Sequence, residues 1–246
     1  MGRNDERDLF PEAIRLVREC HPKAIMLENV RGIFNPKFND YRTLIIHQLE
    51  NLGYECSWCL VNASQFGVPQ LRPRAVLIAM KKKYFRNFKW PEMGVISTPT
   101  VGETLLREMR KNGWENATIW ARNANDIAPT LVGGSKKHGG ADLGPTRTKN
   151  AWLKLGVDAK GLADAPPPKG YVGLPRLTVE MTALLQGFPS NWKFEGKKTA
   201  AYRQVGNAFP PPVARAIGES IVTAIIETEQ KEQIEGIGYE ETRIAR

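Results

Sequence analysis

Polar residues suited to chemistry first appear directly after a short apolar run at 24–27. This run, Ala-Ile-Met-Leu, is followed by Glu28-Asn29-Val30. In open α/β sheets, ligands bind outside the carboxyl ends of the strands, so an acid at this place is a candidate for catalysis or binding. A loop carboxylate that acts as a cap fits the same residues equally well.

A second group of polar side chains directly precedes the apolar run at 75–80. The segment reads Gln70-Leu71-Arg72-Pro73-Arg74. Strand alternation places Gln70, Arg72 and Arg74 on one face, where they are suited to bind a carboxylate, a phosphate or a base edge. The alternative interpretation is a solvated edge strand.

Two later segments combine glycine and proline with polar side chains. They are Gln186-Gly187-Phe188-Pro189 and the run 204–212, QVGNAFPPP. Gly206 followed by Asn207 permits a tight turn, and three consecutive prolines then lead into the last predicted helix. We expect this rigid entry to present Asn207 to a ligand.

The three cysteines of the chain do not indicate a metal site or a disulfide. Cys56 and Cys59 lie three residues apart in a predicted strand, so their side chains point to opposite faces. A single CxxC pair is also a weak zinc signal. Cys20 and His21 are adjacent near a helix end, and adjacent helical residues do not face each other. We expect all three cysteines to be buried structural residues.

The elements that must hold these residues follow the pattern of part of a doubly wound α/β sheet. Apolar periodicity predicts helices over 8–20, 41–52 and 213–228, and one that begins at Thr178 and ends at Pro189. Apolar runs predict strands over 24–27, 56–61 and 75–80, of which the first is expected to be buried and parallel. Between 81 and 175 we expect irregular structure, with short β segments at 118–120 and 130–132 and a loop over the glycine-rich stretch from 131 to 149.

Positive charge is concentrated in the middle of the 246-residue chain. The net charge is +9, and residues 81–175 hold 16 Lys and Arg against 8 Asp and Glu, which is +8. Aromatic residues such as Trp114, Trp120 and Trp152 lie among these cations, which favours a polyanion-binding face over a merely solvated basic surface. With 41% hydrophobic and 25% charged residues, the composition excludes a disordered or fibrous chain.

The same composition bounds the cellular setting. There is no apolar stretch of the roughly 18 residues that a membrane-spanning helix needs, so no membrane partner is expected. The charged start of the chain, MGRNDERDLF, has no apolar signal core, and three cysteines are too few for a disulfide scaffold. We expect a reduced, cytoplasmic environment.

The order and wording of these motifs resemble the later part of a DNA cytosine-5 methyltransferase of the bacterial modification type. NDERDLFPEAIRLV resembles the fifth conserved motif of that family, ENVRGIF the sixth, FGVPQLRPRAVLIA the eighth, RLTVEMTALLQGFP the ninth and QVGNAFPPPVA the tenth. The resemblance spans about residues 4–220 and is interrupted by the segment that reads the DNA in this family. That segment holds +8 of the +9 net charge.

The resemblance implies an α/β fold with two parts. A partial doubly wound, Rossmann-like methyltransferase sheet would be joined by a smaller, irregular, β-rich target-recognition domain. The expected domains are residues 1–85 for the C-terminal part of the catalytic domain, 86–198 for target recognition and 199–246 for a final helix that returns to the catalytic domain.

The resemblance also implies a reaction and a role for individual residues. A cytosine flipped out of double-stranded DNA is attacked at ring carbon 6 by a cysteine thiolate, and carbon 5 takes a methyl group from S-adenosylmethionine. Glu28 would contact the ring nitrogen beside the carbonyl and Arg74 the carbonyl oxygen, while Arg72 would orient the site and Asn29 would order the nucleophile loop. The implied methyl-donor contacts are Leu9, Asn207 and Ala208, and the implied DNA contacts are Gln70, Arg122, Thr130, Leu131, Lys136, Lys137 and Arg147.

Two motifs of the family do not occur in this sequence. There is no Pro-Cys pair, which carries the nucleophile, and no Phe-x-Gly-x-Gly, which opens the methyl-donor site. We therefore expect the chain to be inactive by itself and to need an N-terminal methyltransferase half. Strand 24–27 would then have an unpaired edge, so the chain alone is expected to be poorly soluble or oligomeric.

Several interpretations of this departure stay open on the sequence. The chain is a fragment of a longer enzyme, one subunit of a split methyltransferase or a relic. A different class of function is a non-catalytic DNA-binding module, and a third is an unrelated α/β protein that binds RNA or another anion through its basic segment.

Overall fold

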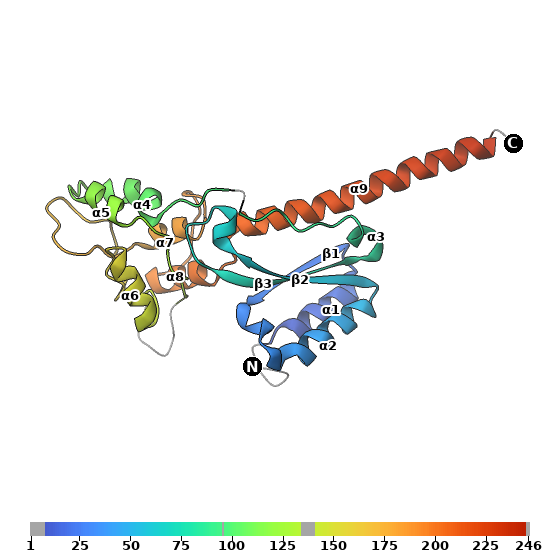
Figure 1. Cartoon of the computed structure of the whole chain (residues 1–246), viewed down its shortest axis with the longest axis horizontal. Coiled ribbons are helices and arrows are strands. Elements are labelled where there is room, and N and C mark those ends of the chain that lie inside the picture. The colour runs from blue at the N-terminus through green and yellow to red at the C-terminus, as the bar shows by residue number, and fades with distance from the viewer. Residues whose placement is uncertain (1–7, 95, 134–140, 245–246) are drawn as a thin grey trace. The chain divides into compact units, whose positions relative to one another are not determined.

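The chain divides into two compact units in a computed structural model, which describes residues 8–94, 96–133 and 141–244 (Figure 1). Unit 1 comprises Met1–Val61, Pro73–Pro91 and Arg215–Arg246, and unit 2 comprises Asn62–Arg72 and Glu92–Ala214. The boundaries between these units therefore differ from the expected domain boundaries after residues 85 and 198. In particular, residues 62–72 belong to unit 2, although they connect two strands of unit 1.

Unit 1 is built on a three-stranded sheet in the order β1-β3-β2. Its elements are α1 (Phe10–Cys20), β1 (Ala24–Val30), α2 (Asn39–Glu50), β2 (Tyr54–Asn62), β3 (Pro73–Lys81), α3 (Lys82–Phe85) and α9 (Pro211–Ile244), with short 3-10 turns at Arg31–Phe34, Pro36–Phe38 and Ala63–Phe66. Helices α1 and α2 pack their buried aliphatic residues against one face of the sheet, where Ala75, Leu77 and Ala79 of β3 complete the core. Figure 1 shows α9 on the opposite side of the sheet.

The strand that precedes Glu28 differs from the expectation in length, direction and burial. β1 continues to Val30, so Glu28 and Asn29 are part of the strand instead of following it. It pairs antiparallel with β3, with Ala24 opposite Met80 and Val30 opposite Arg74. The prediction of a buried parallel strand is therefore wrong, because a four-residue apolar run does not reveal the direction of its partner. The α/β class is confirmed, and the doubly wound arrangement stays a prediction.

The central position of β3 explains its sequence. All six residues of the run Ala75–Met80 are fully buried, as a strand covered on both faces requires. The alternative of a solvated edge strand, stated for residues 70–74, is wrong, because Gln70 and Arg72 are buried and Arg74 lies on the central strand. β1 instead lies at one end of the strand order, and Met26 and Val30 on it are exposed.

Local signals located the helices of unit 1 to within a few residues. Pro11 lies in the first turn of α1, and Gly53 follows α2 with a φ of +84°. α9 is longer than the expected 213–228, because two prolines form its first turn and no further proline interrupts it. No helix in the described part of the chain is long and apolar enough to cross a membrane.

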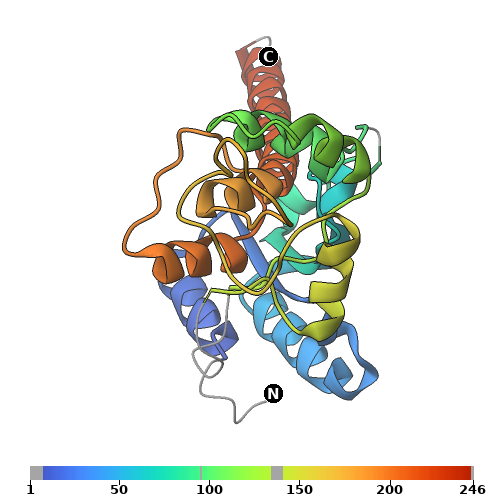
Figure 2. The ribbon, with the colours of Figure 1, turned by 90° about the vertical axis from the view of Figure 1, so that its left-hand side faces the viewer.

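Unit 2 is helical, which corrects the expectation of a β-rich domain. Its helices are α4 (Val101–Arg110), α5 (Ala117–Asn123), α6 (Thr146–Lys154), α7 (Val179–Leu185) and α8 (Lys198–Asn207). Figure 2 shows these helices joined by long loops. The predicted β segment at 118–120 lies inside α5, and 130–132 forms no strand. The stretch 131–149 was expected to be largely loop; its described residues before Thr146 lie in no helix or strand, and α6 begins at Thr146.

Three tryptophans of the basic segment are buried in the core of unit 2. Trp114, Trp120 and Trp152 are at most 6% exposed and pack with aliphatic residues of α4 and α7. The expected interleaving of cations and aromatics on one face is therefore wrong for these residues. A tryptophan that is surrounded by lysines in the sequence can lie on the surface or in the core, because long-range packing decides whether its ring is buried.

The cysteine predictions are confirmed in part. Cys56 and Cys59 lie on a strand, β2, as predicted, but they are half-buried and not fully buried, and Cys20 is exposed although it was expected to be buried. Burial raises the pKa of Cys56 to about 12 and raises that of Cys59. Across the described residues, no group of three His, Cys, Asp or Glu is placed to hold a metal ion.

Candidate active site

The first candidate group, in unit 1, is an ion pair between neighbouring strands. Glu28 lies opposite Val76 in the register of β1 and β3, and Arg74 lies opposite Val30. Glu28 and Arg74 are therefore diagonal neighbours on one face of the sheet, within reach of long side chains. Arg74 Nε donates to Glu28 Oε1 across 2.7 Å, and the side chains are 12% and 29% exposed.

The guanidinium of Arg74 is held in a fixed orientation. Besides the contact to Glu28, its Nη1 donates to the carbonyl of Pro73 at 2.9 Å. Burial lowers the pKa of Arg74, and the charge of Glu28 opposes that shift. Arginine stays protonated in proteins even so. The result is a fixed cation beside a carboxylate, an arrangement that can bind a polar ring edge through both a donor and an acceptor.

The other candidates of unit 1 lie near the ends of β1 and α1. The Asn29 side chain accepts from the amide of Val30 at 2.8 Å, which fixes its Oδ1. Leu9 precedes α1 and is 73% exposed, an apolar side chain available to a ligand. Its neighbour Asp8 accepts from the hydroxyl of Tyr41 and from the amide of Phe10. Those bonds anchor the start of α1.

In unit 2, the Arg72 side chain binds three backbone carbonyls from two segments that are far apart in sequence. Its Nη1 donates to Leu131 O at 2.7 Å, and its Nη2 donates to Gly206 O at 2.7 Å and to Ala208 O at 2.9 Å. The side chain is only 1% exposed. One guanidinium therefore binds both the segment at 131 and the segment 206–208 and links them through hydrogen bonds.

Two buried glutamines reinforce the same junction. Gln70 and Gln186 are both fully buried, and Gln70 Nε2 donates to Gln186 Oε1. Gln70 Oε1 accepts from the amide of Leu131 at 2.9 Å, and Gln186 Nε2 donates to Ala208 O at 2.6 Å. A buried amide side chain needs such partners. The network ties the end of α7, the segment at 131 and the end of α8 together.

Asn207 lies at a different point of the fold than expected. It is the last residue of α8, whereas the final helix begins at Pro211. Gly206 is thus helical and does not form the tight turn that its pairing with asparagine indicated. Asn207 itself is exposed.

The predicted DNA contacts fall into three groups. Gln70 and Leu131 are fully buried, so their side chains are engaged inside unit 2 and are not available to DNA, and Thr130 donates its hydroxyl to Leu71 O. Arg122 on α5 and Arg147 on α6 are exposed, as phosphate or base contacts require. Lys136 and Lys137 lie outside the described residues.

Two site residues have no role in the sequence-based prediction. Gln186 belongs to the segment Gln186-Gly187-Phe188-Pro189 noted in the sequence, and its place at the end of an apolar helix was the feature that could have indicated a buried polar role. Gly133 was predicted only as part of the glycine-rich loop, and its contact with the end of α8 was not predicted.

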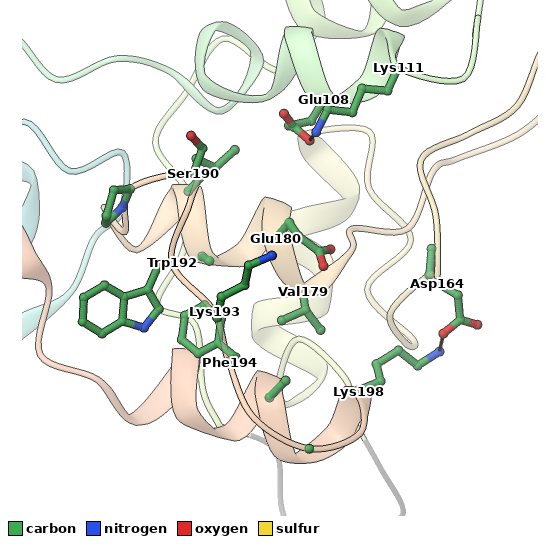
Figure 3. A pocket seen from close by; sticks show the side chains of 16 residues that line it. Glu108, Lys111, Asp164, Val179, Glu180, Ser190, Trp192, Lys193, Phe194 and Lys198 are labelled. Carbon is green, nitrogen blue, oxygen red and sulfur yellow. Dashed lines mark ion pairs between the residues drawn. The ribbon is translucent and has the colours of Figure 1, made fainter.

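A pocket of about 350 Å³ in unit 2 is separate from all of these residues (Figure 3). The ion pairs Glu108–Lys111 and Asp164–Lys198 line it, together with the exposed Trp192. None of the predicted site residues is among its lining residues. It has no part in the arrangement described above.

Unit 1 therefore presents a Glu28–Arg74 pair on an α/β framework, and unit 2 is a helical unit held together by the buried Arg72. Known proteins are similar to this chain in sequence and in fold. The family model of the C-5 cytosine-specific DNA methylases matches residues 1–223, and the chain belongs to this family. The motif-based resemblance is thereby confirmed.

Named relatives are type II methyltransferases. M.NaeI of Lentzea aerocolonigenes is 57% identical over 229 residues, which are 92% of this chain and 55% of that protein. M.NgoMIV of Neisseria gonorrhoeae is 50% identical over 228 residues, which are 92% of this chain and 72% of that protein. The chain thus spans little more than half the length of M.NaeI.

Solved structures agree at the level of the fold. The S. pombe Dnmt2 methyltransferase superposes with a TM-score of 0.55 at 15% identity, over 91% of this chain and 75% of that chain. The Entamoeba histolytica methyltransferase EhMeth gives a TM-score of 0.55 at 15% identity, over 90% of this chain and 70% of that chain.

Proposed function

We propose that this chain is the C-terminal portion of a DNA cytosine-5 methyltransferase of a restriction–modification system. It would act on a flipped-out cytosine within a specific sequence of double-stranded DNA. The observation that carries the proposal is the Glu28–Arg74 pair, at 2.7 Å on adjacent strands of a chain that belongs to the C-5 cytosine methylase family.

The pair complements the edge of a cytosine. Arg74 would donate to the ring carbonyl oxygen, and Glu28 would contact the adjacent ring nitrogen. A nucleophile that adds to the ring places negative charge on this edge, and fixed partners there stabilise that charge without reorganisation. Because β1 and β3 hold both side chains, the geometry exists before any ligand arrives.

Of the residues that the resemblance assigns to the methyl donor, Leu9 lies in unit 1, and Asn207 and Ala208 lie in unit 2. Leu9 offers an apolar surface and Asn207 an amide, which suit the base and the polar groups of such a ligand. S-adenosylmethionine supplies the electrophilic methyl group when it is bound. We propose that Leu9 contributes an apolar contact and Asn207 an amide contact, whereas the backbone of Ala208 is already engaged by Arg72, Gln186 and the last turn of α8.

The nucleophile is proposed to come from an N-terminal methyltransferase half. Cys56 and Cys59 lie on β2 with raised pKa values, so both are protonated at neutral pH and poor nucleophiles. No Pro-Cys pair occurs in the sequence. β1 lies at the end of the sheet order, where a further strand can be added.

The test is methyl transfer from labelled S-adenosylmethionine to mixed-sequence DNA. The chain is assayed alone, then with a polypeptide equivalent to the part of M.NgoMIV that this chain does not match. We expect transfer only in the mixture, and its loss with Glu28→Gln. Transfer by the chain alone would overturn the missing-nucleophile argument. DNA binding without transfer in the mixture would instead support a non-catalytic DNA-binding module.

A further inference from the structure

Asn207 has a second contact, inside unit 2, at the root of the proposed recognition segment 131–133. A Cβ added to Gly133 would lie 2.4 Å from Asn207 Oδ1 and 3.0 Å from its Cγ. The Asn207 side chain therefore lies directly against the Cα of Gly133, and only glycine leaves room for it there.

The backbones of the two segments are equally close. A Cβ added to Gly206 would lie 2.4 Å from the amide nitrogen of Gly133 and 2.7 Å from the carbonyl carbon of Val132. Arg72 binds carbonyls on both sides of this contact. A displacement of the end of α8 is therefore transmitted to 131–133, because the two segments touch and share one rigid guanidinium.

We propose that Asn207 is a positioning residue for the recognition segment and that its contact with Gly133 couples methyl-donor binding to DNA reading. The coupling rests on the proposed function, whereas the positioning role rests on the contact alone. A ligand that engages the Asn207 amide changes how that side chain meets Gly133. By thermodynamic reciprocity, DNA that orders 131–133 changes the affinity at Asn207 by the same factor.

The positioning role is tested by hydrogen exchange of the Leu131 amide in the full chain. Gly133→Ala forces a methyl group against Asn207, so we expect about tenfold faster exchange at this amide. Asn207→Ala removes both atoms that the new methyl group meets, and the next contact is Arg203 O at 3.1 Å. The double variant Gly133→Ala/Asn207→Ala should therefore return to the exchange rate of Asn207→Ala alone.

If Asn207→Ala restores the slower exchange, the defect of Gly133→Ala comes from its contact with Asn207 and not from the loss of a glycine in general. Gly218→Ala is the matched control, because a Cβ at that helical glycine meets nothing within 4 Å. It should leave the Leu131 amide unchanged. Unchanged exchange in Gly133→Ala, or a defect that persists in the double variant, overturns the positioning role.

The coupling is tested with the same variants by titrating the full chain with a mixed-sequence DNA duplex, with and without S-adenosylmethionine. The methyl donor should change the DNA affinity of the unsubstituted chain and leave that of Asn207→Ala unchanged. We expect weaker binding in Gly133→Ala and recovery in the double variant. If the chain binds DNA and the affinities do not follow this pattern, the coupling is wrong. If the unsubstituted chain binds no DNA, the proposed DNA-reading function fails together with the coupling, while the exchange experiment still decides the positioning role.

Discussion

Replacement of Arg72 by methionine is expected to destabilise unit 2 strongly. The side chain is 1% exposed and donates to three carbonyls at 2.7 to 2.9 Å. A hydrogen bond to a charged group contributes about 1.5–3 kcal/mol, so three sum to roughly 5–9 kcal/mol. Desolvation of the guanidinium offsets several kcal/mol of this sum. We expect a net loss of about 3–5 kcal/mol, as when one partner of a buried ion pair is removed.

Urea unfolding of the full chain measures this loss through tryptophan fluorescence. Trp114, Trp120 and Trp152 are buried in unit 2 and report its transition. With a slope of about 2 kcal/mol per molar urea, the midpoint should fall by about 2 M. Arg122→Met is the control, since Arg122 is exposed on α5 and its replacement should change stability by less than about 0.5 kcal/mol. A loss below about 1 kcal/mol for Arg72→Met would refute the carbonyl-binding role.

Three further predictions follow from other contacts. Glu28→Gln removes the carboxylate at the ring edge, so methyl transfer by the reconstituted enzyme should fall by about 10²-fold or more, with DNA affinity unchanged in a titration. Gly206→Ala places a Cβ 2.4 Å from a backbone nitrogen, so its unfolding free energy should fall by about 1–3 kcal/mol, whereas Gly218→Ala should not lower it. At pH 8 a thiol-specific reagent should label the exposed Cys20 first and Cys56 far more slowly, because a pKa of about 12 keeps the Cys56 thiol protonated. Equal labelling rates in a timed mass-spectrometric assay would contradict that burial.

The extent of several elements could be predicted from sequence because their signals are local. Thr178 caps α7 through its hydroxyl, which accepts from the amide of Met181, and Gly53 follows α2 in the left-handed region. Such caps and turns depend on residues a few positions apart. The family was also readable, because the order and wording of its motifs survive without any knowledge of the fold.

The partners of the site residues could not be read in the same way. Alternation placed Gln70, Arg72 and Arg74 on one face, yet the first two belong to unit 2 and Arg74 belongs to unit 1. Arg72 meets carbonyls 59 and 134 residues away, and nothing in the local sequence points to them. The prediction of β structure in unit 2 was wrong for a related reason. Apolar periodicity is weak in this segment, and its short helices are stabilised by burial of indole rings in the core of the unit.

The sequence by itself determined the family, the distribution of charge, the local ends of helices and the residue types available for chemistry. Those properties reside in neighbouring residues and in their order. Tertiary structure alone decided that Glu28 lies within a strand and meets Arg74 diagonally, that Arg72 is a buried brace, and that Asn207 lies against Gly133. Each of these contacts joins segments distant in the chain and exists only once the chain has folded, and burial strengthens the hydrogen bonds of Arg72 in particular.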